Sequence, residues 1–197
     1  MAIGGRPRDA GIDIALRKVI FDMLAESAPH EVSLRSLTTR AGVTRDAFYR
    51  RYPSIGHFYV DLAAEKYPSD PTVDTGSLHE DLLVIQREQA AMCNGLLEQH
   101  LLPQLLGAMA SDPSSAAAFA EWFLAPRRAT YLRVFQRAVE RAEIPPVQDP
   151  QYVLDLLSGA IFLRAAIPGI GVIDDEFVRQ TVASAERELT AGGLSGP

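Results

Sequence analysis

The sequence predicts an all-α fold of about nine helices, and three observations lead to this prediction. Apolar residues recur three and four places apart through most of the chain, which is the spacing of one helix face. Sustained alternation of apolar and polar residues is scarce, and Asn94-Gly95 lies in a helical pattern, where it is expected to end a helix. Helix start signals are frequent, including the Asp-Pro pairs at 112–113 and 149–150.

The first expected helix carries Ile12 and Leu16 on one face and ends near Ala28-Pro29. Two short helices and a fourth, over about 54–67, come next. The segment YPSDPTVDTG then interrupts the helical pattern with two prolines and a glycine. We expect this segment, residues 67–77, to be a linker between two domains.

The two short helices form the most informative part of the chain, SLRSLTTRAGVTRDAFYRRYPS. Ser33 and Thr44 can each cap a helix, and Gly42 between them supplies the backbone freedom that a sharp turn needs. Phe48 and Tyr52, four residues apart, can hold the second helix against its neighbours while the side chains between them face outward. This is the pattern of a helix-turn-helix whose second helix, about 44–52, is directed at DNA.

The rest of the chain predicts five longer helices. Ser77 and Glu80 form a capping box, and Pro126 is expected to kink the long seventh helix. The eighth helix is apolar almost all round and should be buried on more than one side, so the last two helices are expected to pack against the core and a second subunit. The nine expected ranges are 12–28, 33–41, 44–52, 54–67, 78–94, 101–110, 113–143, 150–166 and 174–191.

The charge of the chain is unevenly distributed. The net charge is −6, yet residues 1–66 carry 10 Lys and Arg against 8 Asp and Glu, while the remainder carries 9 against 17. Within 33–54 there are five Arg and one Asp. A local basic face is what phosphates would meet, so the acidic total does not exclude DNA binding, although it argues against non-specific coating of DNA.

Composition and short motifs exclude several other classes of protein. Cys93 is the only cysteine, which excludes a disulfide framework, and the apolar run 156–163 is too short to cross a bilayer. With no apolar signal core at the N-terminus, we expect a soluble cytoplasmic protein. The four His are scattered, and no nucleophile elbow, phosphate-binding glycine loop or metal-spaced cluster is present. We therefore expect no enzyme activity, no cofactor and no metal.

The stretch VSLRSLTTRAGVTRDAFYRRYPSIGHFY resembles the DNA-binding signature of the TetR-type bacterial transcriptional regulators. The segments GSLHEDL, FLAPRRATYLRVFQRAVERAE and DPQYVLDLLSGAIF are similar to one subgroup of the ligand-binding domains of that family. The resemblance implies a DNA-binding domain at 1–66, the linker at 67–77 and a ligand-binding and dimerisation domain at 78–197. It also implies a homodimer on a palindromic operator, joined through the helices at about 150–166 and 174–191, and a largely apolar effector that changes the spacing of the two DNA-binding domains.

The same resemblance implies which residues contact DNA. Thr44, Tyr49 and Arg51 match positions that hold phosphates, and Arg45, Asp46, Ala47 and Arg50 match positions that face base edges; Arg35, Arg6 and Arg8 complete the expected contacts. Two residues depart from the pattern of the family. Ile55 stands where a Lys is common, which removes one phosphate contact, and Asp46 stands where a small residue is frequent.

Three of these assignments have alternatives. Arg45 can donate to guanine and Asp46 can accept from cytosine N4, which would favour G·C pairs, but Asp46 can equally favour the helix N-terminus electrostatically. Tyr49 is either a phosphate donor or part of the core, and helix geometry favours the contact. Arg6 and Arg8 either reach the minor groove or form a solvated tail.

The residues that could line a ligand cavity are apolar, aromatic or amide side chains in the C-terminal helices, and most of them should be plain core. We expect Cys93 to be a packing residue and not a redox sensor, because no resolving thiol accompanies it. The candidates are Gln86, Gln89, Met92, Cys93, Leu96, Met109, Trp122, Phe123, Tyr131, Phe135 and Phe162.

Two functions from different classes are compatible with the sequence. The first is a ligand-responsive regulator, most simply a repressor that a small molecule releases from its operator. The alternative is a dimeric small-molecule-binding helical protein that has lost operator binding, which Ile55 and the acidic total charge keep open. Salt-dependent binding to an operator would separate the two, because displaced counterions accompany phosphate contacts.

Overall fold

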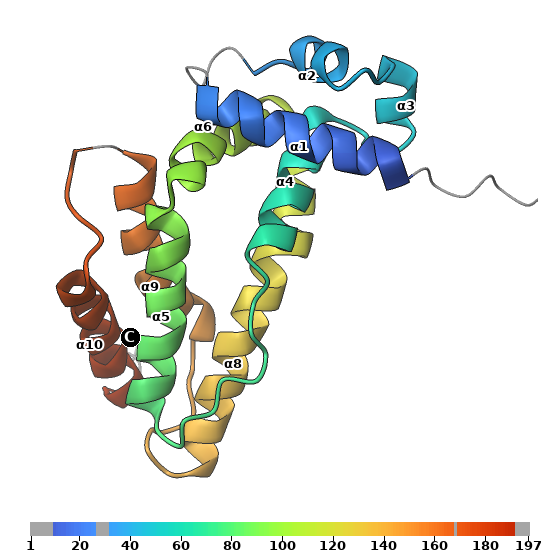
Figure 1. The fold of residues 1–197 in the computed structure, drawn as a ribbon. Helices are drawn as coiled ribbons and strands as arrows, with labels where there is room; N and C mark the ends of the chain where they lie inside the picture. The colour runs from blue at the N-terminus through green and yellow to red at the C-terminus, as the bar shows by residue number, and fades with distance from the viewer. Residues whose placement is uncertain (1–9, 27–31, 168, 192–197) are drawn as a thin grey trace, which may run out of the picture.

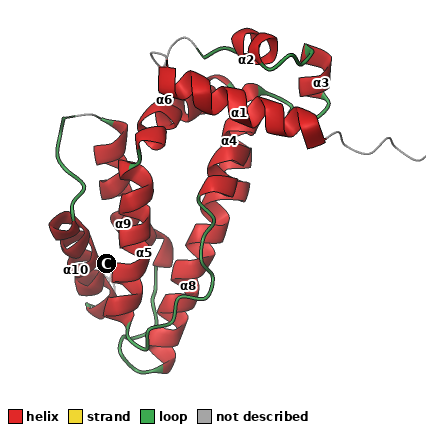
Figure 2. Cartoon of the chain, in the orientation of Figure 1, coloured by secondary structure: helices red, strands yellow, loops and turns green. Residues whose placement is uncertain are grey.

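The computed structural model describes residues 10–26, 32–167 and 169–191, and every regular element in these ranges is a helix (Figures 1 and 2). α7, η2 and α8 follow one another without a break, so these ranges contain nine helical rods, and the predicted all-α fold is confirmed. None of the described helices is long and apolar enough to span a membrane. The elements are α1 (Ala10–Glu26), α2 (Leu34–Arg40), α3 (Arg45–Tyr49), α4 (Ile55–Lys66), α5 (Leu78–Asn94), α6 (Leu96–Ser111), α7 (Pro113–Ala118), η2 (Phe119–Leu124), α8 (Ala125–Glu140), α9 (Pro150–Ala166) and α10 (Asp175–Thr190).

The helices α1 to α4 form a head at the top of the molecule, and α5 to α10 form a body below it (Figure 1). The apolar core of the head contains Leu16 of α1, Phe48 of α3 and Phe58 of α4, all fully buried. The same cluster continues into the body through Leu101 of α6 and Phe119 of η2. The packing of apolar side chains therefore joins the head to α6 and η2 and does not stop at the linker.

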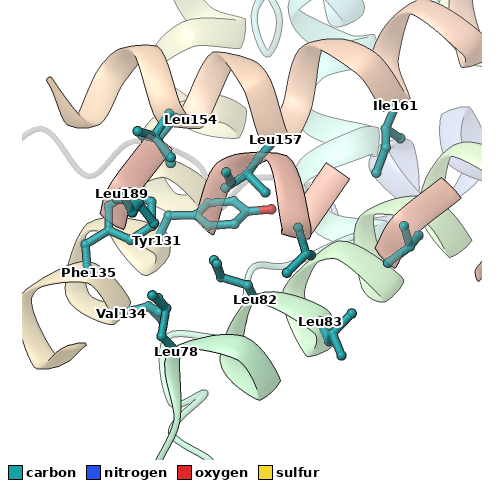
Figure 3. Packing of buried hydrophobic residues seen from close by; sticks show 14 of the residues in the cluster. Leu78, Leu82, Leu83, Tyr131, Val134, Phe135, Leu154, Leu157, Ile161 and Leu189 are labelled. Carbon is teal, nitrogen blue, oxygen red and sulfur yellow. The ribbon is translucent and has the colours of Figure 1, made fainter. Parts of the chain in front are cut away.

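The body has a second core between α5, α8, α9 and α10. Leu82, Tyr131 and Leu157 lie close together in this core (Figure 3), each 2% exposed or less. Val182 of α10 belongs to the same core and is fully buried. α10 buries a single stripe of its surface, as its sequence pattern predicts, and leaves a polar face outward. These four helices form the lower part of the molecule, away from the head.

The segment 67–77 contains no helix or strand and descends along α8 from the end of α4 to the start of α5 (Figure 1). Two arginines of α8 hold it there, because Arg127 donates to the carbonyl of Tyr67 and Arg137 donates to the carbonyl of Val73. At its lower end the backbone N–H of Thr75 donates to the fully buried carboxylate of Asp81, at 2.6 Å.

The head meets α7 at a close contact that depends on Gly56. A Cβ atom at this position would lie 2.2 Å from the hydroxyl oxygen of Ser115, so only glycine lets α4 and α7 approach this closely. Beside it, the Ser54 hydroxyl, which caps α4, shares hydrogen bonds of 2.9 Å with His57 Nδ1 and Ser115 Oγ. Ser115 in turn donates to the carboxylate of Asp112, at 2.7 Å.

Two helices differ from their expected ranges. α6 begins at Leu96 and not near residue 101, with Pro103 inside it, because Leu101 and Leu105 are buried against the head and this burial offsets the hydrogen bond that proline cannot make. The second helix of the helix-turn-helix, α3, is shorter than expected. It runs over Arg45–Tyr49 and continues only as a turn through Arg51. The expected end of α1 near Ala28-Pro29 lies outside the described residues.

The long seventh helix is irregular before Pro126 and not at it. Its six residues at η2 form π-helical turns, in which the backbone N–H of Ala125 bonds to the carbonyl of Ala120. A proline removes one N–H and clashes with the carbonyl four residues earlier, and a widened turn accommodates both effects. The sequence located the disturbance correctly, but it predicted a kink where the structure has a π-helical segment.

Candidate nucleic-acid interface and adjoining cavities

The helix-turn-helix is held by the caps that its sequence predicts. The hydroxyl of Ser33 accepts from the Ser36 backbone N–H at 3.1 Å, and the hydroxyl of Ser36 accepts from the Ser33 N–H at 3.0 Å. The hydroxyl of Thr44 accepts from the N–H of Ala47 at 3.2 Å and so fixes the start of α3. Between the helices Gly42 has φ +63°, a conformation that side chains rarely adopt.

The inner face of α3 packs on aromatic rings of the head. Phe48 is fully buried, with its ring centroid 5.4 Å from that of Tyr52 and 5.8 Å from that of Phe58. Ala47 is also buried, at 6% exposed, which differs from the expectation that it faces a base edge. Because α3 is little more than one turn long and lies flat on the rest of the head, the adjacent residues Ala47 and Phe48 are both buried.

The outer face of α3 carries Arg45, Asp46, Tyr49 and Arg50, all exposed. Tyr49 is 52% exposed and its ring stands nearly perpendicular to that of Phe48, at 85°, so this tyrosine lies at the surface and not in the core. Within the described chain Arg45 and Arg50 make no ion pair with a carboxylate, so their charges face solvent. Thr44 and Arg35 are exposed beside them.

Arg51 is placed differently from the other candidates for DNA contact. Its side chain is 10% exposed, its Nε lies 2.9 Å from a carboxylate oxygen of Asp13 in α1, and its Nη1 donates to the carbonyl of Ala47. It therefore ties α3 to α1, in contrast to the expected outward phosphate contact. Ile55 packs against the core of the head, where it supports the start of α4. Arg6 and Arg8 lie outside the described residues.

A cavity of about 310 Å³ lies between the end of α4 and the helices α5, α6, η2, α8 and α9. It is largely apolar, and its walls include six of the candidates from the sequence: Gln89, Met92, Cys93, Phe123, Tyr131 and Phe162. The structure adds residues that the sequence did not single out, and these complete the wall: Ala63, Tyr67, Leu101, Leu102, Leu105, Phe119, Leu124, Arg127, Arg128, Asp155, Ser158 and Gly159.

The remaining candidates lie elsewhere. Phe135 belongs to the core of the body, and Met109 packs against the core of the head. Trp122 is 44% exposed and meets His57 edge to face, with ring centroids 5.8 Å apart. Gln86 is fully buried, donates to the Leu157 carbonyl and accepts from the Tyr131 hydroxyl. The side chain of Leu96 lies outside the described part of the structure.

A second cavity, of about 380 Å³, lies between residues 66–70 and helices α5 and α8. Five residues line both cavities: Tyr67, Gln89, Met92, Arg127 and Tyr131. The two spaces are therefore neighbours on either side of one group of side chains. Tyr67 is the residue that ends α4, so the helix that leaves the head ends in this shared wall.

Arg127 is the charged group at the centre of this wall. Its guanidinium donates to the carbonyl of Phe123 at 2.8 Å and to the carbonyl of Tyr67, and it lies over the Phe123 ring, 3.6 Å from the centroid. Burial lowers the pKa of Arg127 to about 10, and burial raises the pKa of the Cys93 thiol to about 11, against the opposing effect of the nearby guanidinium. Cys93 is therefore protonated at neutral pH, as a packing residue would be.

The residues that the structure describes contain no group of three or more His, Cys, Asp or Glu side chains placed to hold a metal ion. The structure instead has two candidate binding regions, which are the helix-turn-helix surface near the start of α4 and the two cavities near its end. The chemistry that this arrangement supports is the binding of a polyanion on one surface and of a small, largely apolar molecule inside.

Comparison with known proteins gives a consistent result. Residues 72–185 match the family model described as tetracyclin repressor-like, C-terminal domain. The chain is similar to an uncharacterized HTH-type transcriptional regulator, YdeS, of Bacillus subtilis (strain 168), with 26% identity over 191 residues. The aligned residues make up 95% of this chain and 94% of YdeS. It is also similar to the crystal structure of the TetR family transcription regulator SCO0332, with a TM-score of 0.68 and 28% identity over 95% of this chain and 98% of the other.

Proposed function

Because the chain belongs to the tetracycline-repressor-like (TetR) family of transcriptional regulators, we propose that it binds a palindromic operator as a homodimer and that a small molecule in its cavity releases it. The observation that carries the proposal is the position of α4. One end of this helix supports the packed face of α3 through Phe58, and its other end, Tyr67, lines both cavities. A ligand in these cavities would therefore contact the helix that supports α3 and its DNA-binding surface.

The proposed division of the chain follows from this arrangement. Residues 1–66 bind DNA, 67–77 form the linker, and 78–197 hold the ligand and the dimer contact. On DNA, Arg45, Asp46 and Arg50 meet base edges in the major groove, and Thr44, Tyr49 and Arg35 meet phosphates. Arg51 supports the surface from behind through its pair with Asp13.

The proposed dimer contact lies on α9 and the segment that follows it. Tyr152 and Leu163 of α9 are each about half exposed, at 50% and 52%, and Ile167, Ile170 and Val172 beyond it are 47%, 50% and 73% exposed. Large apolar side chains gathered in this way on a surface are typical of a protein interface. The exposed positions of α10 are mostly polar, so α9 contributes most of the apolar area.

The proposal is tested by fluorescence anisotropy with DNA from upstream of the protein's own gene, at two salt concentrations and with unrelated competitor DNA. We expect competitor-resistant binding by two chains per operator that weakens steeply with salt. Arg45→Ala should weaken operator binding roughly 10- to 100-fold, because a bidentate base contact is lost. Arg87→Ala is the matched control, since Arg87 is exposed on α5 and pairs with Asp175.

Failure to bind this DNA, followed by failure of a genome-wide operator selection, would contradict the proposal. The dimeric small-molecule-binding protein without operator binding would then be the better description. An unchanged affinity of Arg45→Ala for a confirmed operator would contradict the assignment of α3 as the reading helix.

A further inference from the structure

The cavity walls contain a cation whose charge is not paired. In the described part of the chain, no carboxylate lies within 4 Å of the Arg127 guanidinium, and its partners are two backbone carbonyls, the Phe123 ring and the Met92 sulfur at 3.8 Å. All of these partners are neutral. A partly buried charge left without a counter-ion is costly, which is why buried charges in proteins are usually paired.

The acidic residues nearby have partners of their own or lie farther away. Asp155, which lines the same cavity, is 2.7 Å from Arg128. Asp70, at the second cavity, accepts two hydrogen bonds from Thr72. Glu88 lines that second cavity only, and burial raises its pKa, with Asp70 adding to the effect. The charge of Arg127 therefore remains available to a ligand.

We propose that the effector is an amphipathic carboxylate whose acid group pairs with Arg127 and whose apolar body lies among Leu105, Phe119 and Phe162. The planar guanidinium can donate two parallel hydrogen bonds to a carboxylate, the strongest neutral-pH contact available in this cavity. The rest of the wall is mostly apolar, which selects a medium-chain or aromatic acid over a small polar one. This assignment rests on the proposed function, in which a ligand of this cavity controls DNA binding.

The contact has a direct consequence for α4. A carboxylate competes for the guanidinium with the neutral carbonyl of Tyr67, the residue that ends α4, and a hydrogen bond in which both partners are charged is the stronger of the two. Binding of the acid removes the side chain that fastens the end of α4 to α8. The acid and the Tyr67 carbonyl then compete for the same guanidinium, and this competition couples ligand binding in the cavity to the position of α4 and the head.

The test is isothermal titration calorimetry on the full chain without DNA, using decanoate, decanol and decylamine, with naphthoate as the aromatic acid. We expect decanoate to bind roughly 10- to 100-fold more tightly than decanol, because one charge-assisted pair separates them. Decylamine should bind more weakly than decanol. Since this comparison uses only the wild-type chain, it does not depend on how any variant folds.

Variants locate the effect. In Arg127→Gln the preference for decanoate over decanol should vanish, and in Arg127→Lys part of it should return. Arg87→Gln, which removes a positive charge from the exposed surface of α5, should keep the full preference. Equal affinity for the acid and the alcohol, tighter binding of the amine, no binding of either acid, or an undiminished preference in Arg127→Gln would each overturn the proposal.

The outcome is separable from that of the proposed function. Operator binding is measured on the ligand-free protein, and the preference for an acid is measured without DNA. A chain that binds its operator but shows no preference for acids contradicts only the carboxylate assignment. A chain that binds decanoate through Arg127 but no operator contradicts only the regulatory function.

Discussion

The head and the body each hold an arginine largely out of solvent, and the two arginines have opposite surroundings. Arg51 in the head lies 2.9 Å from the Asp13 carboxylate and donates to the carbonyl of Ala47 in α3. Arg127 in the body has only neutral partners and stands between two cavities. The difference indicates that the charge and the packing of the head are balanced within the chain. The body, in contrast, contains cavities that a ligand could fill and a charge that a ligand could pair.

The largest expected effect tests how complete the packing of the head is. Phe48 is fully buried among Tyr52 and Phe58, so Phe48→Ala should lower the free energy of unfolding by about 3–5 kcal/mol. Urea denaturation followed by circular dichroism measures this loss. Tyr49→Ala is the control, because the neighbouring ring is 52% exposed and its removal should cost less than about 1 kcal/mol. Equal losses would mean that the aromatic cluster does not hold α3.

The next effect compares the two arginines directly. Arg51→Met leaves the Asp13 carboxylate without its partner and should destabilise the protein by about 1–3 kcal/mol. Arg127→Met removes a charge that has no counter-ion and places an apolar side chain beside apolar walls, so its effect on stability should stay within about 1 kcal/mol. The same denaturation experiment measures both variants. A greater loss in Arg127→Met would show that its contacts with the carbonyls of Phe123 and Tyr67 stabilise the fold by more than its unpaired charge costs.

The smallest expected effect concerns the contact between the head and α7. Hydrogen bonds from Ser114, Ser115 and Ser54 hold the pKa of Asp112 well below its ordinary value of 3.8. Because the pKa is lower in the folded state, the ionised carboxylate contributes stability above pH 3.8, and this contribution is lost as the pH falls towards the folded value. The stability difference between wild type and Asp112→Asn should therefore shrink between about pH 5 and about pH 2.

Thermal unfolding at a series of pH values measures this difference, with Asp22→Asn on the exposed surface of α1 as the control. A difference that stays constant over the whole range would show that the serine hydroxyls do not favour the ionised carboxylate. Such a constant difference would also contradict a role for the charge of Asp112 in the contact between Ser54 of the head and Ser115 of α7.

The parts of the fold that the sequence predicted are those that local chemistry decides. The caps at Ser33, Thr44 and Ser77 and the turn at Gly42 each depend on residues within a few positions, and all are present. The buried stripe of α10 was likewise readable from its spacing alone. The start of α6 was not predictable in this way, because Pro103 opposes a helix locally and the helix is held by the burial of Leu101 and Leu105 against the head.

The candidate site was predictable only in part, for a related reason. The outward side chains of α3 follow from the capped helix and its buried Phe48, but the burial of Ala47 and the pairing of Arg51 depend on how α3 meets other helices. Arg127 was overlooked because nothing near it in the sequence indicates its role. Its contacts with Phe123 are local, but those with Tyr67 and Met92 come from residues far from it in the chain.

The π-helical segment η2 holds one residue more than an unbroken α-helix would need to join α7 to α8. In an unbroken α-helix Trp122 would continue the stripe begun by Ser115 and Ala118, yet Trp122 is 44% exposed and Phe123 is buried in its place. The extra residue is absorbed in the widened turn, so α7 and α8 keep their orientations towards the head and the body. A deletion of one residue within this widened turn should therefore disturb the two ends of the rod less than the same deletion within α8, which would rotate everything beyond it by about 100°. The widened turn lies in the wall of the cavity, because Phe119, Phe123 and Leu124 line it, so a change of length here would reshape the ligand space before it moved the head.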